Sequence, residues 1–320
     1  MGRCGMTEPL RPMSTGELLD RTFRLYKNHF KLFLGIATLG PAATLAFQLF
    51  TATSTTLPGA TSHQPRASVY PAAFGFGVIA GVIIMLAGMA LAHAATVRAV
   101  AAVHLGRDIS IGGAYAALKG RVWRILALVL AIVLMVGICA VVFAGAAGAL
   151  AFGVLYVLGG LQAGRGGVIA GLSFFAAGLG GAVLAFLVVY VRYALAIQAC
   201  IVEDLGIRPS LRRSALLSKG SRWRVVAIFL VFLILTWIVS VGLGGMAGAV
   251  SVVIPNKIIA LMIVYLASFV AGSLTGPLAT IGMSLLYYDE RVRKEAFDLQ
   301  LMMATLDEAA PAASVPIPAQ

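Results

Sequence analysis

Charged residues are scarce in this chain of 320 residues. Only 11% of the residues are charged, whereas 60% are hydrophobic. Because a soluble domain carries roughly a quarter of charged residues, this composition excludes an ordinary water-soluble fold and indicates a protein of the lipid bilayer. Regular alternation of polar and apolar residues is also missing from the apolar runs, which excludes an outer-membrane β-barrel.

Cysteine and histidine are scarce as well. The three cysteines are Cys4, Cys139 and Cys200, and the four histidines are His29, His63, His93 and His104. The scattered cysteines form no disulfide framework. The histidines and carboxylates show no spacing that would bind a metal for hydrolysis. The sequence therefore predicts a non-enzymatic protein with no cofactor and no metal.

Six long apolar runs dominate the sequence instead. Each has about the 20 residues that a helix needs to cross a hydrocarbon core of ~30 Å, and backbone groups in lipid must satisfy one another, which favours helices. The runs predict an all-α polytopic membrane protein with six transmembrane helices. The predicted spans are 32–50, 71–93, 125–148, 167–190, 225–248 and 258–287. Pro41 and Pro277 lie inside the first and last spans and predict kinks.

Acidic residues are absent from these spans and from every second connection. All 12 acidic residues and all but three of the 24 Lys and Arg residues lie in the terminal segments or in the connections between spans 2 and 3 and spans 4 and 5. The exceptions are Arg66, Arg165 and Lys257. The asymmetry predicts cytoplasmic termini and a multi-pass protein of the bacterial cytoplasmic (inner) membrane. It also explains the net charge of +12 without a nucleic-acid partner.

A basic and aromatic hexapeptide occurs twice, each time directly before a predicted span. Residues 119–124 read KGRVWR and residues 219–224 read KGSRWR, and a diverged copy with Phe30 in the tryptophan position covers 27–31. The spacing predicts three two-helix repeats, about 14–104, 109–200 and 208–290, each preceded by an amphipathic interfacial helix. The alternative is chance similarity, because segments beside membrane spans generally favour Lys, Arg and Trp.

The repeats form a single predicted membrane domain over 14–304. It follows an N-terminal tail (1–13), ends in a short cytoplasmic helix (289–304), and precedes a C-terminal tail (305–320) that is predicted to be disordered. In the first amphipathic segment, Ser14 and Glu17 fit a capping box. Leu19, Phe23, Tyr26 and Phe30 recur at helical spacing after it. This apolar face is predicted to lie toward the acyl chains, with the cations toward lipid phosphates.

Small residues at helical spacing predict close approach between the spans. The pairs are Gly77/Gly81, Gly167/Gly171, Gly244/Gly248 and Gly272/Gly276.

The candidate functional residues are the cations and tryptophans of the three repeated segments. They are Arg21, Arg24, Lys27, Lys31, Lys119, Arg121, Trp123, Arg124, Arg212, Arg213, Lys219, Arg222, Trp223 and Arg224. One interpretation is that they bind the headgroups of membrane lipids, anionic ones in particular. The other is that they only anchor the topology, with Trp at the interface and Lys or Arg reaching toward water.

Three stretches carry a resemblance to a known family. Residues 10–26, residues 212–224, and the sequence LLYYD at 285–289 followed by Arg291 resemble the bacterial glycerophosphoryl diester phosphodiesterase membrane domain family. The resemblance covers about 10–300 and implies a membrane region. In the enzymes of that family the region is fused to a catalytic barrel, which this sequence lacks, so the resemblance carries no catalytic residue to this chain.

The sequence leaves three functions open. A non-enzymatic membrane-organising or accessory module, which contacts lipids or an envelope protein partner, fits the repeated basic segments and the missing active-site residues. A transporter, channel or lipid translocator fits the internal repeats and the prolines, although the absence of acids from the spans opposes ion coupling. A membrane-embedded lipid enzyme would require Glu203, Asp204 or Asp289 beside arginines, which ordinary ion pairing explains more simply.

Overall fold

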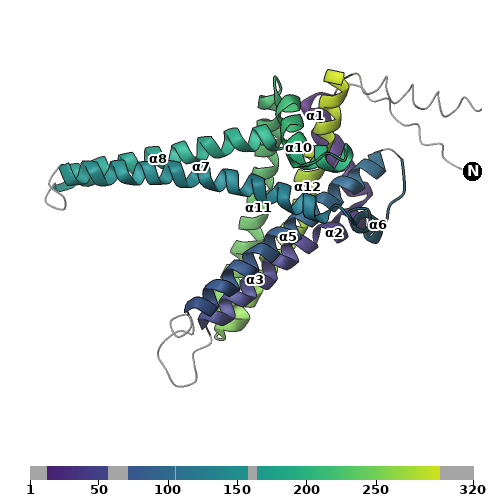
Figure 1. Cartoon of the computed structure of the whole chain (residues 1–320). Coiled ribbons are helices and arrows are strands. Elements are labelled where there is room, and N and C mark those ends of the chain that lie inside the picture. The colour runs from purple at the N-terminus through teal and green to yellow at the C-terminus, as the bar shows by residue number, and fades with distance from the viewer. Residues whose placement is uncertain (1–12, 57–70, 105, 158–163, 296–320) are drawn as a thin grey trace, which may run out of the picture.

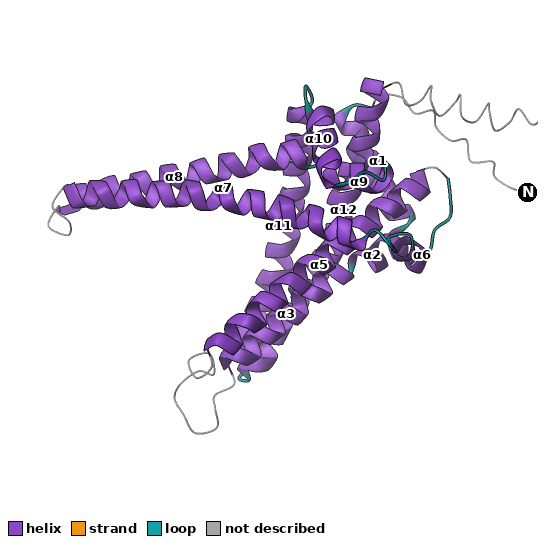
Figure 2. Ribbon diagram, in the orientation of Figure 1, coloured by secondary structure: helices purple, strands orange, loops and turns teal. Residues whose placement is uncertain are grey.

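The computed structural model describes residues 13–56, 71–104, 106–157 and 164–295. These residues form α-helices and no strand (Figure 2). The helices are α1 (Thr15–Asn28), α2 (Phe30–Ala37), α3 (Leu39–Thr56), α5 (Pro71–His104), α6 (Ile111–Ala116), α7 (Val122–Val157), α8 (Gly164–Tyr193), α9 (Ala196–Val202), α10 (Ile207–Ser218), α11 (Arg222–Val253) and α12 (Lys257–Glu295).

The six predicted spans are confirmed. Six segments of the described chain are long and apolar enough to cross a membrane, and α2 and α3 together make the first of them. The spans pack in sequential pairs, α3 with α5, α7 with α8, and α11 with α12 (Figure 1). The protein is therefore an all-α polytopic membrane protein built from three helical hairpins.

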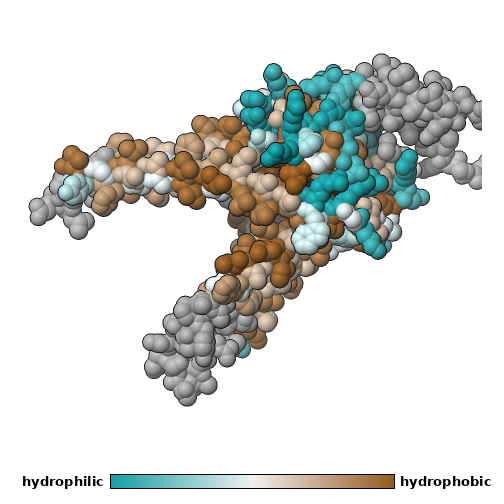
Figure 3. Space-filling view, in the orientation of Figure 1, coloured by the Kyte–Doolittle hydropathy of each residue, from teal (hydrophilic) through white to brown (hydrophobic). Residues whose placement is uncertain are grey.

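The three hairpins meet at one end, and beyond it one of them separates from the other two. The α7–α8 hairpin diverges from α3, α5, α11 and α12, which lie together (Figure 1). Hydrophilic residues gather where α1, α9 and α10 cover the converging helices, and hydrophobic residues cover the hairpins (Figure 3). We call this hydrophilic region, with α1, α6, α9, α10 and the adjoining helix ends, the charged end.

The best-packed core also lies at the charged end. Its largest fully buried side chains include Leu18, Phe33, Leu195, Leu217 and Tyr287, which come from four helices and the turn before α9. Many large apolar side chains of α7 and α8 are exposed instead, as expected of surfaces in contact with lipid. The charged end is consequently the part of the protein in which side-chain positions are most tightly determined.

The prediction for the end of the last span needs correction. Asp289 does not begin a separate helix, because α12 runs unbroken to Glu295 and residues 296–304 lie outside the described part. Ion pairs four residues apart, such as Arg293 with Asp289, favour this continuation.

The two prolines of the spans have different surroundings. In the first span α2 ends at Ala37 and α3 begins at Leu39, although Thr38 keeps helical dihedral angles and the bonds from Thr38 to Leu34 and from Ala42 to Thr38 are present. The interruption at Thr38 is therefore the bond that Pro41, without an amide hydrogen, cannot donate. The buried Pro277 lies inside α12, which remains helical across it.

The first amphipathic helix faces the protein rather than presenting its apolar face only to lipid. The predicted capping box is confirmed, with the Ser14 hydroxyl 3.2 Å from the Glu17 amide nitrogen. Leu18 and Thr22 are fully buried, whereas Phe23 is 42% exposed. The Tyr26 hydroxyl donates to the Leu274 carbonyl of α12 at 2.9 Å. Tyr26 belongs to the predicted face, but the fully buried Leu18 and Thr22 do not, and Thr22 was not identified because it is polar.

The glycine pairs differ in their surroundings. A Cβ at Gly77 or Gly81 would collide with the rings of Phe50 and Phe47, so this pair brings α5 close to α3 as predicted. A Cβ at Gly244 or Gly248 would meet no neighbouring atom of the described residues. The α7–α8 contact depends on a different residue, Gly178, which lies against α7.

Candidate functional site

The glycine of each hexapeptide makes the turn from an amphipathic helix into a span. Gly120 has a φ of 83° and Gly220 a φ of 90°, a backbone conformation that strongly favours glycine. The tryptophans that follow, Trp123 and Trp223, are 84% and 80% exposed. The repeated sequence therefore encodes a sharp turn followed by an exposed aromatic residue.

The arginines of the first hexapeptide pair with a carboxylate of the chain. Arg121 Nη2 and Arg124 Nη1 each lie 2.7 Å from a different oxygen of Asp204. Asp204 follows α9 and has a φ of 54°, which aspartate tolerates better than most residues. Both cations are therefore ion-paired within the protein, although the single carboxylate balances only one of their two charges.

Arg213 of α10 forms a second ion-pair cluster. Its Nε lies 2.9 Å from Glu203 Oε2, and its guanidinium also pairs with Glu295 at the end of α12. The hydrogen bond with Glu295, reinforced by Glu203, raises the pKa of Arg213 above its ordinary value. Glu203 also accepts a hydrogen bond from the Tyr287 hydroxyl. These contacts hold α10 against the end of α12.

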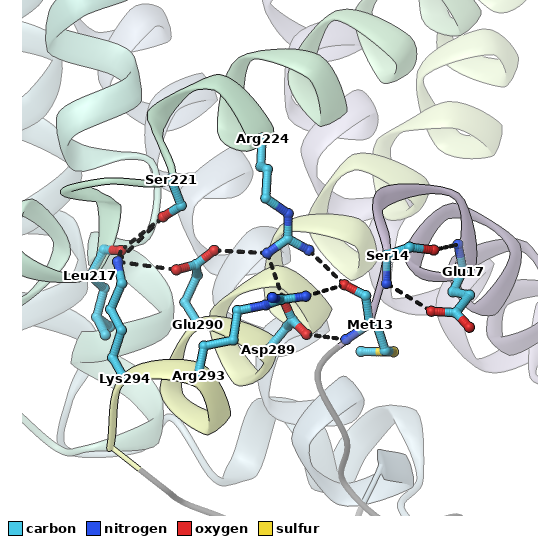
Figure 4. A network of polar contacts seen from close by, with 10 residues as sticks. All are labelled: Met13, Ser14, Glu17, Leu217, Ser221, Arg224, Asp289, Glu290, Arg293 and Lys294. Carbon is cyan, nitrogen blue, oxygen red and sulfur yellow. Dashed lines mark hydrogen bonds and ion pairs between the residues drawn. The ribbon is translucent and has the colours of Figure 1, made fainter.

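Arg224 of the second hexapeptide belongs to a buried network around Asp289 (Figure 4). Arg224 Nη1 and Arg293 Nε lie 2.7 and 2.8 Å from Asp289 Oδ2, and the Met13 amide donates to Asp289 Oδ1 at 2.6 Å. Both arginines also donate to the Met13 carbonyl. The network attaches the residue before α1 to α11 and α12.

Glu290 and Lys294 extend this network toward α10. Glu290 lies 3.0 Å from Arg224 Nη1 and 3.1 Å from Lys294 Nζ. Lys294 also donates to the carbonyls of Leu217 and Lys219, at the end of α10 (Figure 4). A lysine at this position satisfies carbonyls that have no partner within their own helix.

A cavity of different character lies where α8, α10 and α11 meet. It has a volume of about 520 Å³, and no carboxylate lines it. We call it the basic pocket, after its five cationic side chains, Arg192, Arg208, Arg212, Lys219 and Arg222. None of them has an ion-pair partner among the described residues, in contrast to Arg213 and Arg224 nearby.

The orientation of α10 explains why its cations separate into two groups. Arg208, Arg212 and Lys219 recur at spacings of four and seven residues, which places them on one side of the helix. The opposite side is held by the buried Ser214, whose hydroxyl donates to the Arg192 carbonyl at 2.9 Å and accepts from the Leu195 amide at 3.2 Å. The Arg213 side chain projects from α10 between these two sides.

The structure divides the candidate residues into three sets. Arg212, Lys219 and Arg222 line the basic pocket, with Trp223 next to them in the sequence. Arg121, Arg124, Arg213 and Arg224 form the ion pairs described above, and the exposed Arg24 pairs with Asp20 at 3.2 Å. The remaining residues lie elsewhere, Lys27, Lys31 and Lys119 exposed and Arg21 beside the Met13 sulfur.

The sequence prediction missed two residues of the pocket. Arg208 precedes Arg212 by one helical turn, a spacing that could have identified it. No local pattern connects Arg192 to α10, because the contact between the Arg192 carbonyl and Ser214 is tertiary.

Known proteins provide no further guide to the site. No family model, curated protein or solved structure matches this chain. The resemblance to the glycerophosphoryl diester phosphodiesterase membrane domain family therefore stays a prediction. Within the described residues, no group of three His, Cys, Asp or Glu side chains could hold a metal ion.

Proposed function

We propose that this integral membrane protein is a non-enzymatic module that organises lipids by binding anionic headgroups at its charged end. The basic pocket is the observation that supports this function. Its five cations have no acidic partner in the described chain, whereas the neighbouring arginines are ion-paired internally. A lipid phosphate would supply the missing negative charge and the hydrogen-bond acceptors that guanidinium groups prefer.

Apolar groups beside the pocket support a lipid rather than a free anion. Leu216 lines the pocket and is 55% exposed, and Trp223 is 80% exposed next to Arg222. An indole ring in this position suits the level of the headgroups, with the acyl chains continuing along α8 and α11. A soluble phosphate would gain nothing from these side chains.

The proposed orientation follows from the same charges. The charged end would face the cytoplasm of a bacterial cell, with the protein in the inner membrane, because cationic segments are retained on that side. Anionic lipids would then occupy the inner leaflet around α8, α10 and α11. An envelope protein that depends on such lipids remains the proposed class of partner.

Removing two pocket cations tests the proposal. In Arg212→Gln/Arg222→Gln, the preference of the full chain for phosphatidylglycerol over phosphatidylcholine should fall by about 30-fold at low salt, at roughly 1 kcal/mol for each cation. The measurement is a titration of the purified protein with each lipid, followed by native mass spectrometry. The preference of the wild-type protein should also weaken as salt rises.

A charge-matched control separates the pocket from general electrostatics. Lys27→Gln/Lys31→Gln removes two exposed cations at α1 and α2, outside the pocket. This control should retain the preference to within about threefold, because exposed cations elsewhere act only at a distance. An equal loss in both double variants would show that net charge, not the pocket, determines lipid preference.

A transporter, channel or lipid translocator is the second candidate. It is favoured by the interruption of the first span at Thr38 and by Pro277 inside α12, because broken helices form many transport sites. Flux of fluorescent lipids or solutes through reconstituted vesicles would support it, and flux equal to that of empty vesicles would exclude it.

A further inference from the structure

A second cavity lies among the long helices. It has a volume of about 350 Å³, is partly open, and is lined by residues of α2, α3, α5, α11 and α12. It shares no lining residue with the basic pocket. We call it the bundle cavity, and its properties do not depend on the function proposed for the charged end.

The lining of the bundle cavity extends along α12. Ser268, Gly272, Gly276 and Thr280 line it at intervals of four residues along one side of that helix. At a rise of 1.5 Å per residue, the 12 residues from Ser268 to Thr280 cover about 18 Å. Because the cavity is partly open, an extended chain could lie along these residues with its far end in the surrounding lipid.

The walls of the bundle cavity are mostly apolar, and a few polar side chains interrupt them. Most of the hydroxyl groups that line it donate to carbonyls of their own helices, so they offer only acceptor capacity to the cavity. These bonds join Thr44 to Gly40 (3.2 Å), Thr96 to Ala92 (2.8 Å), Ser268 to Val264 (3.0 Å) and Thr275 to Ala271 (2.9 Å).

Two longer side chains offer unused hydrogen-bonding groups. The exposed His93 side chain lines the cavity, and its Nδ1 lies 3.3 Å from the Thr280 hydroxyl. Its Nε2 and the Gln48 amide have no partner among the described residues. Such groups are costly in hydrocarbon unless a ligand or water satisfies them.

The chemistry of these groups selects the ligand. No charged side chain lines the bundle cavity, so a phosphate would be left without a countercharge. The Gln48 amide both donates and accepts, and His93 Nε2 does one or the other according to its tautomer. A hydroxyl group can satisfy all of these states. We propose that the bundle cavity holds one acyl chain and the free hydroxyl of an uncharged amphiphile of the diacylglycerol class, whose second chain lies in the surrounding lipid.

The glycines of α12 leave the space for this ligand. A Cβ at Gly276 would meet no atom within 4 Å, and one at Gly272 would meet only Pro41 of α3, at 3.2 Å. Leucine at 276 would therefore fill the cavity without disturbing a helix contact. The pair predicted for close packing instead opens a cavity on one side of α12.

Photolabelling of the full chain in phosphatidylcholine nanodiscs tests the proposal. The probe is a diacylglycerol with a diazirine in one acyl chain, and the labelled peptides are identified by mass spectrometry. Label should concentrate in residues 89–96 and 268–280, and Gly276→Leu should reduce it by about tenfold or more because the side chain occupies the site. The matched control is Gly242→Leu in α11, outside the cavity and equally unobstructed, which should label like the wild type.

A second probe tests recognition of the hydroxyl without any substitution. The same lipid with its hydroxyl converted to a methyl ether loses its donor, so it should label residues 89–96 several-fold less. Equal labelling by the two probes would overturn the proposal, because the cavity would then accept any acyl chain. Label spread over all lipid-facing helices, or undiminished in Gly276→Leu, would overturn it as well.

Discussion

Arg212 and Arg213 are adjacent in the sequence, yet their side chains have different surroundings. Arg213 is held between Glu203 and Glu295, whereas Arg212 lines the basic pocket, whose charged side chains are all cations. Arg222 and Arg224 differ in the same way. At the scale of single residues, the cations of the charged end therefore fall into two groups. Those that form an ion pair with an Asp or Glu of the protein stabilise the fold, and those without such a partner are candidates for binding a ligand.

Asp289 is the most critical of the internal acids. Its side chain is fully buried, and it receives two arginines and the Met13 amide. Asp289→Asn should lower the free energy of unfolding by about 2 kcal/mol, because both arginines lose a buried countercharge. Chemical denaturation of the protein in detergent, followed by tryptophan fluorescence, would measure the loss.

Asp20→Asn provides the control for that substitution. Asp20 is exposed and pairs only with the exposed Arg24, so its removal should cost under about 0.5 kcal/mol. Equal costs at the two positions would contradict the fastening role assigned to the Asp289 network.

At the scale of elements, the hexapeptide turn joins a surface helix to a span. Gly220 has a φ of 90°, so Gly220→Ala should destabilise the protein by about 1 kcal/mol and loosen the end of α10. Gly245→Ala in the middle of α11 should cause no loss, because the position is helical and unobstructed. Thermal unfolding of both variants in detergent would measure the difference in stability. An unchanged stability in Gly220→Ala would contradict the requirement for glycine at this turn.

Features that depend on local sequence could be predicted for these elements. The six spans follow from runs of apolar residues, the capping box from Ser14 and Glu17, and the turn from its glycine. The partners of the arginines could not be predicted in this way. Asp204 lies more than 80 positions from Arg121, and Arg192 joins the basic pocket only because Ser214 binds its carbonyl.

The bundle cavity could not be predicted from local sequence either. The pair Gly272 and Gly276 predicted close packing, and the distances on its two sides show contact at one residue and open space at the other. Whether a small residue allows close contact or leaves open space depends on the helix that faces it. Here that helix contributes Pro41, which lies 3.2 Å from the position of a Cβ at Gly272.

At the scale of the whole molecule, the hairpins share one charged end, and beyond it the α7–α8 hairpin separates from the other two (Figure 1). The basic pocket lies where the diverging hairpin meets the others, with Arg192 and Tyr193 from α8 and Arg222 from α11. Next to it, the rings of Tyr190 and Phe229 pack with centroids 4.2 Å apart. A headgroup in the pocket would therefore connect α8 to α10 and α11, and lipid composition would influence how the hairpins are held together.

The most direct test of lipid binding at the charged end is to locate a bound anionic lipid. Phosphatidylglycerol with a photoreactive headgroup, incorporated with the full chain into nanodiscs, should label residues 192–193 and 208–222 in preference to 15–31, and added salt should reduce the label. Label distributed evenly over the basic segments, or concentrated in 15–31, would contradict the account.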